Sequence, residues 1–261
     1  MIKRFLKTLL FFLFGFFILI GSFVFSVRDR YMVSILMYHN VDHSDRPKTN
    51  TVSPESFLKQ MAYLQQHGYH VITLDAWVTA IKQNKIFPHK TVVITFDDGF
   101  ENNYTQAFAI LKQYQFPATI FLITDVVGKP GFLTWDQIKE MEKSGISFGS
   151  HTRLHSYLPS IDHAEQRNQI QISKEILETQ LGHTIDYLAY PSGGFNESIQ
   201  ALVKESGYKG ACTTNRGYHP HNDDPYEIKR IRFGDQDNSD FVLWVKLSGY
   251  YQIFRKWKNP E

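Results

Sequence analysis

Residues 91–99 read TVVITFDDG, an apolar and β-branched run that ends in two aspartates and a glycine. Such a run is typical of a strand buried on both faces, and strands of this kind belong to parallel sheets covered by helices. Aspartate and glycine favour turns, so we expect the strand to end at Phe96. The stretch therefore predicts an α/β fold and places Asp97 and Asp98 at the carboxyl end of a central strand.

The rest of the chain alternates between strand-like and helix-like patterns. Further strands are predicted at residues 33–38, 69–73, 118–123, 146–149, 185–190, 208–213 and 228–233. Helices are predicted at residues 53–66, 75–84, 104–114, 134–145, 162–181, 196–206 and 240–248. Ser53, Asp75 and Asn196 are the predicted N-caps of three of them, and Thr134 with Gln137 resembles a capping box. About seven or eight strand–helix units predict a mostly parallel sheet with helices on both sides, closed as a distorted or incomplete (β/α) barrel.

One long apolar segment precedes these units. Residues 8–27 carry no charge, and a helix of this length would span about 30 Å, the thickness of the bilayer hydrocarbon. The basic residues within residues 1–7 place that end in the cytoplasm, with residues 28–34 as a linker and residues 35–261 as an extracytoplasmic domain. No A-x-A-like site ends the segment, which favours a single-pass membrane anchor over a cleaved signal peptide and a secreted protein.

Composition excludes some functions. Three of the 28 basic residues lie before residue 8, so the remainder of the chain, with 26 acidic residues, is close to neutral. It contains no basic stripe of the kind that binds nucleic acid. The single cysteine, Cys212, excludes an intrachain disulfide, and its place in a predicted apolar strand indicates packing rather than nucleophilic chemistry.

Polar side chains follow several of the predicted strands at their carboxyl ends. His39 follows the first strand, Asp97 and Asp98 follow TVVITF, and His151 follows the strand at residues 146–149. In α/β barrels the active site forms at this end of the strands. Residues that are far apart in the sequence are therefore predicted to share one site.

The residue types in this set predict a metal-dependent hydrolase. Residues 150–155 read SHTRLH, which places His151 and His155 four positions apart. Two histidines and one aspartate make the three protein ligands of many catalytic divalent-metal sites, with a position left for water. The second aspartate is then free to act as a general base. Each motif alone is common, since DDG is an ordinary turn and the chain has 11 histidines; the combination favours the hydrolase.

TFDDG followed by SHTRLH resembles the polysaccharide deacetylases with a NodB-homology domain, carbohydrate esterase family four. The resemblance extends over about residues 35–232. It implies that Asp97 is the general base and that Asp98, His151 and His155 bind one divalent metal ion. Zinc fits the ligand types, and cobalt, nickel and iron remain alternatives.

Two further motifs resemble one branch of that family. ILMYHNV at residues 35–41 and AYPSGG at residues 189–194 are similar to deacetylases that act on poly-β-1,6-N-acetylglucosamine of biofilm matrices. In that branch the MYH segment supplies the catalytic acid, which here is His39. The resemblance also implies a polysaccharide synthase as a neighbour in the membrane.

The chain departs from the wider family at one motif. Where the family has R-x-P-Y, with an arginine that orients the base, this chain has Ala189 and Ser192 at the arginine and tyrosine positions. Arg230 or Arg232, at the end of a predicted strand, is the candidate replacement for the arginine. The motif itself predicts substrate or oxyanion contacts, with a backbone N–H near Tyr190 as the oxyanion donor. Its candidate residues are Tyr190, Pro191 and Ser192.

Other substrates and one other function class stay open at this point. The same chemistry would serve peptidoglycan, chitin oligomers or O-acetyl esters, and an anchor beside the cell wall suits peptidoglycan. A membrane-anchored carbohydrate-binding module without catalysis is the alternative of another class, although the complete base and ligand set argues against it.

Overall fold

The computed structural model describes residues 11–12, 14–19, 21–22, 31–43, 50–83, 85, 87–217 and 224–255. The chain divides into two units, Met1–Met32 and Val33–Glu261. The described residues between 11 and 22 are helical, but no helix among the described residues is long and apolar enough to cross a membrane. Residues 1–7, 8–10, 13, 20 and 23–27 of the predicted cytoplasmic end and anchor, and residues 28–30 of the linker, lie outside the described residues.

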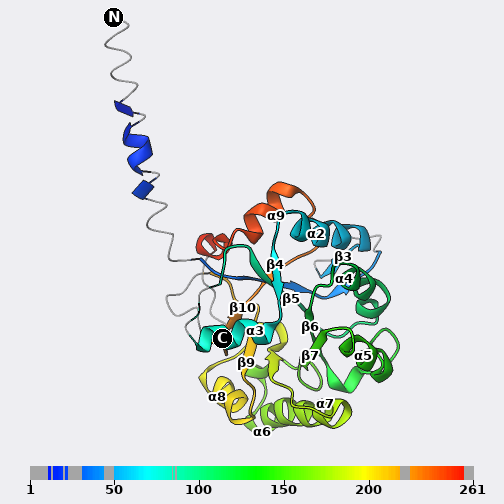
Figure 1. Cartoon of the computed structure of the whole chain (residues 1–261). Helices are drawn as coiled ribbons and strands as arrows, with labels where there is room; N and C mark the ends of the chain where they lie inside the picture. The colour runs from blue at the N-terminus through cyan, green and yellow to red at the C-terminus, as the bar shows by residue number, and fades with distance from the viewer. Residues whose placement is uncertain are drawn as a thin grey trace, which may run out of the picture. The chain divides into compact units, whose positions relative to one another are not determined.

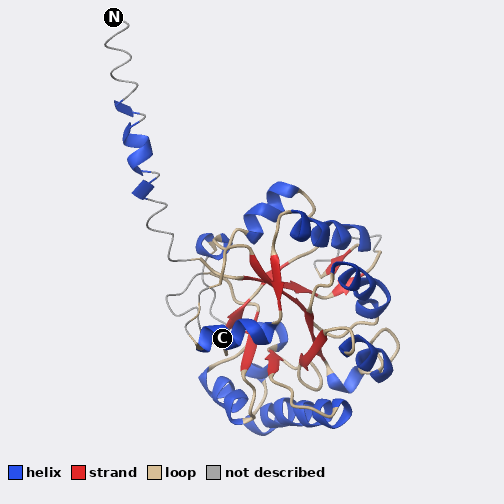
Figure 2. Cartoon of the chain, in the orientation of Figure 1, coloured by secondary structure: helices blue, strands red, loops and turns tan. Residues whose placement is uncertain are grey.

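Val33–Glu261 contains a sheet of nine short strands that are all paired in parallel (Figures 1 and 2). Their order is β10-β9-β8-β7-β6-β5-β1-β11, with β4 paired to the amino-terminal half of β5. The strands are β1 (Ser34–Tyr38), β4 (His70–Ile72), β5 (Thr91–Phe96), β6 (Ala118–Leu122), β7 (Ile146–Ser150), β8 (Tyr187–Ala189), β9 (Gly210–Thr213), β10 (Ile228–Lys229) and β11 (Ile231–Arg232).

The two ends of this strand order meet in one short stretch of chain. Strand β10 pairs with β9 through Ile228 and Cys212, and β11 pairs with β1 through Ile231 and Leu36. Only Arg230 separates β10 from β11, so this stretch joins the two edges of the sheet. The result is a nearly closed barrel of parallel strands, which confirms the barrel part of the predicted fold.

Helices surround the barrel (Figure 2). They are α2 (Pro54–Gln66), α3 (Leu74–Lys82), α4 (Phe108–Tyr114), α5 (Trp135–Glu142), α6 (His163–Arg167), α7 (Ser173–Leu181), α8 (Glu197–Glu205) and α9 (Asp240–Leu247). The predicted caps Ser53 and Asn196 accept backbone N–H bonds, and Thr134 and Gln137 form the predicted capping box. The predicted cap Asp75 is wrong: Thr73 caps α3, and Asp75 accepts a bond from Tyr187 instead.

Two predicted helices are less regular than their apolar periodicity indicates. Residues Asn103–Ala107 form a π-helical turn before α4, and Asn168–Ile172 form another between α6 and α7. Such turns often lie at functional sites. Here the second turn contains Gln169, which accepts a hydrogen bond from the backbone N–H of Leu154 beside His155.

The barrel interior is filled in layers. Alternate residues of the strands point inward, and they form a cluster with Leu74, Trp77 and Val78 of α3. The strand members of this cluster are Ile35, Val93, Phe121, Tyr187, Ala189, Cys212 and Ile228. The guanidinium carbon of Arg230 lies 5.5 Å from the centre of the Phe121 ring. The interior therefore changes from apolar side chains to charged ones at the level of Arg230.

Candidate active site

Three predicted metal ligands converge at the carboxyl ends of the strands. Asp98 Oδ1 lies 3.5 Å from His151 Nε2 and 3.6 Å from His155 Nε2. The candidate ligand atoms all lie within 4.8 Å of one another. Asp98 follows β5 and His151 follows β7, so the parallel strands bring together residues more than fifty positions apart.

Unusual backbone geometry supports this convergence. Asp98, Thr152, His155 and Ser192 adopt φ values of 74°, 64°, 59° and 54°. Side chains other than glycine rarely adopt such values, and each instance costs about 1–3 kcal/mol unless its surroundings enforce it. At Thr152, two hydrogen bonds hold the backbone in this conformation. Its carbonyl accepts from Thr124 N, and its N–H donates to Ser150 Oγ. The sequence pattern gave no sign of this strain.

The donor set fits a divalent metal ion. His151 Nδ1 lies 2.7 Å from the carbonyl oxygen of Ala189 and donates to it, which leaves the Nε2 lone pair directed at Asp98. Burial lowers the pKa of His151 to about 4, so its imidazole is neutral. Burial, and next the charge of Asp97, raise the pKa of Asp98 to about 7. A cation at this point would stabilise the ionised form of Asp98. The sequence did not predict that the carbonyl oxygen of Ala189 would accept the hydrogen bond from His151.

Asp97 is paired with Arg230 inside the barrel. Arg230 Nη1 lies 2.6 Å from Asp97 Oδ1 and Nη2 lies 2.7 Å from Oδ2, and both residues are 2% exposed. Burial alone would raise the pKa of Asp97, but the charge of Arg230 and its hydrogen bonds hold this pKa well below its usual range. Asp97 is therefore a carboxylate at neutral pH.

Arg230, and not Arg232, is the arginine that contacts the predicted base. Its guanidinium is also held by Thr95 Oγ1 at 3.2 Å and by the carbonyl of Thr213 at 3.4 Å. Arg232 is exposed. Among the described residues, Arg230 donates hydrogen bonds to Asp97 and Arg232 does not. Arg230 stands at the junction of β10 and β11, and Arg232 lies two residues further along the chain, at the end of β11.

His39 lies next to Asp97. Its Nε2 is 4.0 Å from Asp97 Oδ2, and its buried Nδ1 has no hydrogen-bond partner in the part of the chain that the structure describes. Burial lowers the pKa of His39 to about 4; Asp97 opposes this effect, and Arg230 and Arg232 add to it. His39 is therefore neutral at pH 7, with one unpaired nitrogen.

The segment after β8 corrects two expectations. The Tyr190 ring is 0% exposed, stacks on Phe195 and donates its hydroxyl to Tyr226 O, so it cannot contact a substrate. The Tyr190 N–H donates to Cys212 O, so the predicted oxyanion donor near Tyr190 has to be another N–H of this segment. Pro191 is buried as well. The Tyr190 N–H continues the pairing of β8 with β9 one residue beyond Ala189, which is why Tyr190 belongs to the core.

Ser192 is the remaining residue of this segment with an available N–H. The N–H groups of Gly193 and Gly194 donate to the carbonyls of Tyr190 and Pro191, and proline has none. Ser192 is exposed, and its φ lies in the left-handed region.

Comparisons with known proteins identify the family of this chain. A sequence model described as polysaccharide deacetylase matches residues 84–211. The chain is 32% identical over 198 residues to a putative polysaccharide deacetylase, YxkH, of Bacillus subtilis, a match that covers 76% of this chain and 70% of that one. It is 33% identical over 203 residues to a poly-β-1,6-N-acetyl-D-glucosamine N-deacetylase of Staphylococcus aureus, which covers 72% and 69%.

A solved structure shows the same architecture. The Streptococcus pyogenes deacetylase PplD, in complex with acetate, superposes with a TM-score of 0.73 at 30% identity, over 79% of this chain and 95% of that chain. The resemblance inferred from TFDDG and SHTRLH is thus confirmed along most of the sequence. The chain belongs to the polysaccharide deacetylase family, the NodB-homology group of carbohydrate esterase family four.

Proposed function

We propose that this protein hydrolyses the acetamido group of N-acetylglucosamine residues in an extracytoplasmic polysaccharide, with poly-β-1,6-N-acetylglucosamine as the first candidate substrate. The observation that carries the proposal is the buried Asp97–Arg230 pair beside the cluster of Asp98, His151 and His155. The Staphylococcus aureus relative, named for that polymer, supports the choice of substrate.

Asp98, His151 and His155 would hold one divalent ion in this proposal. Zinc suits their oxygen and nitrogen atoms, with cobalt, nickel and iron as alternatives. When bound, such an ion polarises the acetyl carbonyl and lowers the pKa of water.

Asp97 is the general base. Each of its oxygens uses one lone-pair direction for Arg230, and a carboxylate oxygen has a second direction with which to accept a proton from water. The oxygen of that water bonds to the acetyl carbon, which becomes tetrahedral and negatively charged on its former carbonyl oxygen. Ser192 N–H, two residues after Tyr190, is the backbone donor assigned to that oxygen.

His39 completes the proton transfers. Because it is neutral at pH 7, it must receive a proton during the reaction before it can act as an acid. Asp97 Oδ2 lies 4.0 Å from His39 Nε2, a separation that one water or a small movement bridges. His39 then donates this proton to the sugar nitrogen as the C–N bond breaks, which yields acetate and a free amine.

The location of the protein is part of the proposal. The uncharged residues 8–27, preceded by basic residues, would anchor it as a single-pass protein, with the deacetylase domain outside the cytoplasmic membrane. A polysaccharide synthase in the same membrane would be a suitable neighbour. Peptidoglycan is the second candidate substrate, because an arginine-rich pocket next to the site favours a glycan with acidic groups.

Substitution of the base tests the mechanism. Asp97→Asn should lower kcat by about 10²- to 10⁴-fold, because an amide cannot accept the proton, while stoichiometric metal remains bound. His155→Ala should lose both metal and turnover. Asp136→Asn, which removes an exposed carboxylate on α5, is the matched control and should keep both. Acetate release and metal content are measured together, and a near wild-type rate for Asp97→Asn would show that the roles are wrong.

A further inference from the structure

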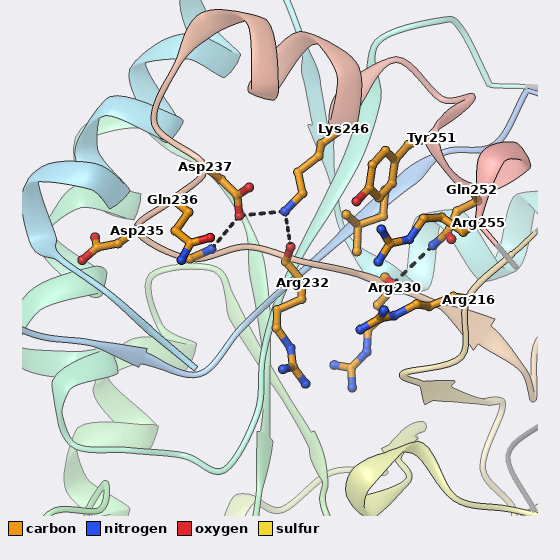
Figure 3. A pocket seen from close by; sticks show the side chains of 12 residues that line it. Arg216, Arg230, Arg232, Asp235, Gln236, Asp237, Lys246, Tyr251, Gln252 and Arg255 are labelled. Atoms are coloured by element: carbon orange, nitrogen blue, oxygen red, sulfur yellow. Dashed lines mark hydrogen bonds and ion pairs between the residues drawn. The ribbon is translucent and has the colours of Figure 1, made fainter. Parts of the chain in front are cut away.

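A cationic pocket lies beside the candidate active site (Figure 3). It has a volume of about 300 Å³ and is bordered by β11, the loop that leads to α9, and the turn at Tyr251–Phe254. Its lining includes five basic residues and only two acidic ones. The basic residues are Arg216, Arg230, Arg232, Lys246 and Arg255, and the acidic ones are Asp235 and Asp237.

Two of the basic residues are already neutralised. Arg230 is paired with Asp97, and Lys246 Nζ lies 2.7 Å from Asp237 Oδ2. The other acidic group, Asp235, accepts bonds from the backbone N–H and hydroxyl of Ser53. The acidic groups of the pocket are therefore committed to other partners.

Among the described residues, three guanidinium groups of this pocket have no acidic partner. In residues 31–43, 50–83, 87–217 and 224–255, no carboxylate forms an ion pair with Arg216, Arg232 or Arg255. Arg255 lies over the ring of Tyr251, with its guanidinium carbon 5.2 Å from the ring centre. Arg216 and Arg232 are exposed to solvent.

These cations are close enough to repel one another. Partial burial of the Arg232 guanidinium is the main cause that lowers its pKa, and the charges of Arg216 and Arg230 lower it further, against the opposing effect of Asp97. Burial also lowers the pKa of Lys246, with Arg255 and Arg216 contributing and Asp237 opposing. An anion in the pocket would relieve this repulsion.

The pocket is also connected to the reaction site. Arg230 borders it and binds Asp97, and the charge of Arg232 contributes to the lowered pKa of His39. Figure 3 shows the side chains of Arg230 and Arg232 extending to the same side of their strand. A group bound near Arg232 would therefore lie next to the residues proposed to act on the acetamido sugar.

We propose that this pocket is a subsite for a carboxylate or phosphate group carried by the polysaccharide, adjacent to the acetamido sugar that is hydrolysed. The proposal rests on the proposed function and adds a class of substrate, a glycan with anionic substituents. Arginine binds carboxylates and phosphates in the same bidentate manner, so the two groups share one chemistry. A volume of about 300 Å³ is that of a saccharide-sized pocket and exceeds what the acetate product requires.

Kinetics on matched substrates provide the first test. N-acetylglucosamine oligomers of one length are compared in neutral, carboxylate-substituted and phosphate-substituted forms. We expect the wild type to have a KM about tenfold lower for at least one anionic form, with the advantage reduced by added salt. Arg216→Gln/Arg255→Gln, which leaves Arg232 beside His39 in place, should abolish the advantage while kcat and the KM for the neutral oligomer change less than twofold.

A control and a second measurement separate this proposal from the proposed function. Arg167→Gln removes an exposed arginine on α6 outside the pocket and should keep the wild-type preference. Binding of the same three oligomers is then measured with a chelator present, so that no hydrolysis is needed. Preference for one anionic form identifies the group.

Equal affinity of the wild type for neutral and anionic oligomers would overturn the subsite. The same conclusion would follow if the double variant kept the preference. Absence of acetate release from every oligomer would overturn the proposed function, while the binding measurement would still decide whether the pocket is an anion subsite.

Discussion

Arg230 shows how a single residue sets the charge of the candidate site. It is buried between β10 and β11, and its two nitrogens lie 2.6 and 2.7 Å from the Asp97 oxygens. A buried carboxylate without such a partner would have a raised pKa and would be protonated at neutral pH. The pair therefore keeps the proposed base ionised inside an otherwise apolar barrel.

Removal of this partner should be visible in the pH dependence of the reaction. Arg230 lowers the pKa of Asp97, so Arg230→Met should raise it, and the acidic limb of kcat/KM should move to higher pH. Loss of one partner of a buried pair also costs about 3–5 kcal/mol of stability. The measurements are a pH–rate profile and a urea unfolding curve. Arg230→Lys keeps the charge and should recover part of the shift; an unchanged acidic limb in the methionine variant would contradict the role.

The elements show which parts of the fold were predictable. Strand β5 has the predicted bounds, since an apolar run that ends in DDG gives both its burial and its end. Helix starts with a side-chain cap were located by the same local logic, as at Ser53 and Asn196. Closure of the barrel at Arg230 was beyond this reasoning, because one six-residue strand was expected where the chain changes its pairing partner.

The sequence predicted the side chains of the candidate site, but not the backbone groups that accompany them. The four residues of the TFDDG and SHTRLH motifs converge, since their types and strand positions are local features of the sequence. The roles of the Ala189 carbonyl and the Ser192 N–H depend on the path of the backbone, which the side-chain pattern does not report. The choice of Arg230 over Arg232 depends on which of the two reaches Asp97 at the junction of β10 and β11, and the sequence pattern does not report this.

Gly149 in β7 provides a test at the scale of the elements. A Cβ atom there would lie 2.7 Å from the Phe121 ring and 2.8 Å from the carbonyl oxygen of Tyr187. Because the backbone of β8 cannot move without loss of strand pairing, Gly149→Ala should lower the free energy of unfolding by about 1–3 kcal/mol.

Urea unfolding measures that change, with Ser147→Ala on the exposed position of the same strand as its control. The control should change stability by less than about 0.5 kcal/mol. Equal stabilities of the two variants would show that the barrel wall near Phe121 is looser than the structure indicates.

At the scale of the whole chain, the proposed anchor determines where the enzyme meets its substrate. Residues 8–27 carry no charge, and the basic residues lie before them. We expect the full chain to sediment with membranes and to resist alkaline carbonate extraction, with the deacetylase domain open to protease added outside the cell.

A variant with two arginines within residues 8–27, at Phe14 and Phe17, should lose membrane association because each charge costs about 2.5–3.5 kcal/mol in the bilayer centre. Membrane fractionation measures this effect. Recovery of the wild-type full chain in the soluble fraction would contradict the anchor and favour a secreted, processed form.

The central claim is metal-dependent deacetylation, and acetate release by the purified full chain tests it most directly. The substrate is a soluble β-1,6-linked N-acetylglucosamine oligomer, with a chelator and subsequent metal addition as the matched conditions. We predict acetate release that the chelator abolishes and that one divalent ion per chain restores. No acetate from this oligomer, from β-1,4-linked oligomers or from peptidoglycan, with metal present and the fold intact, would contradict the account.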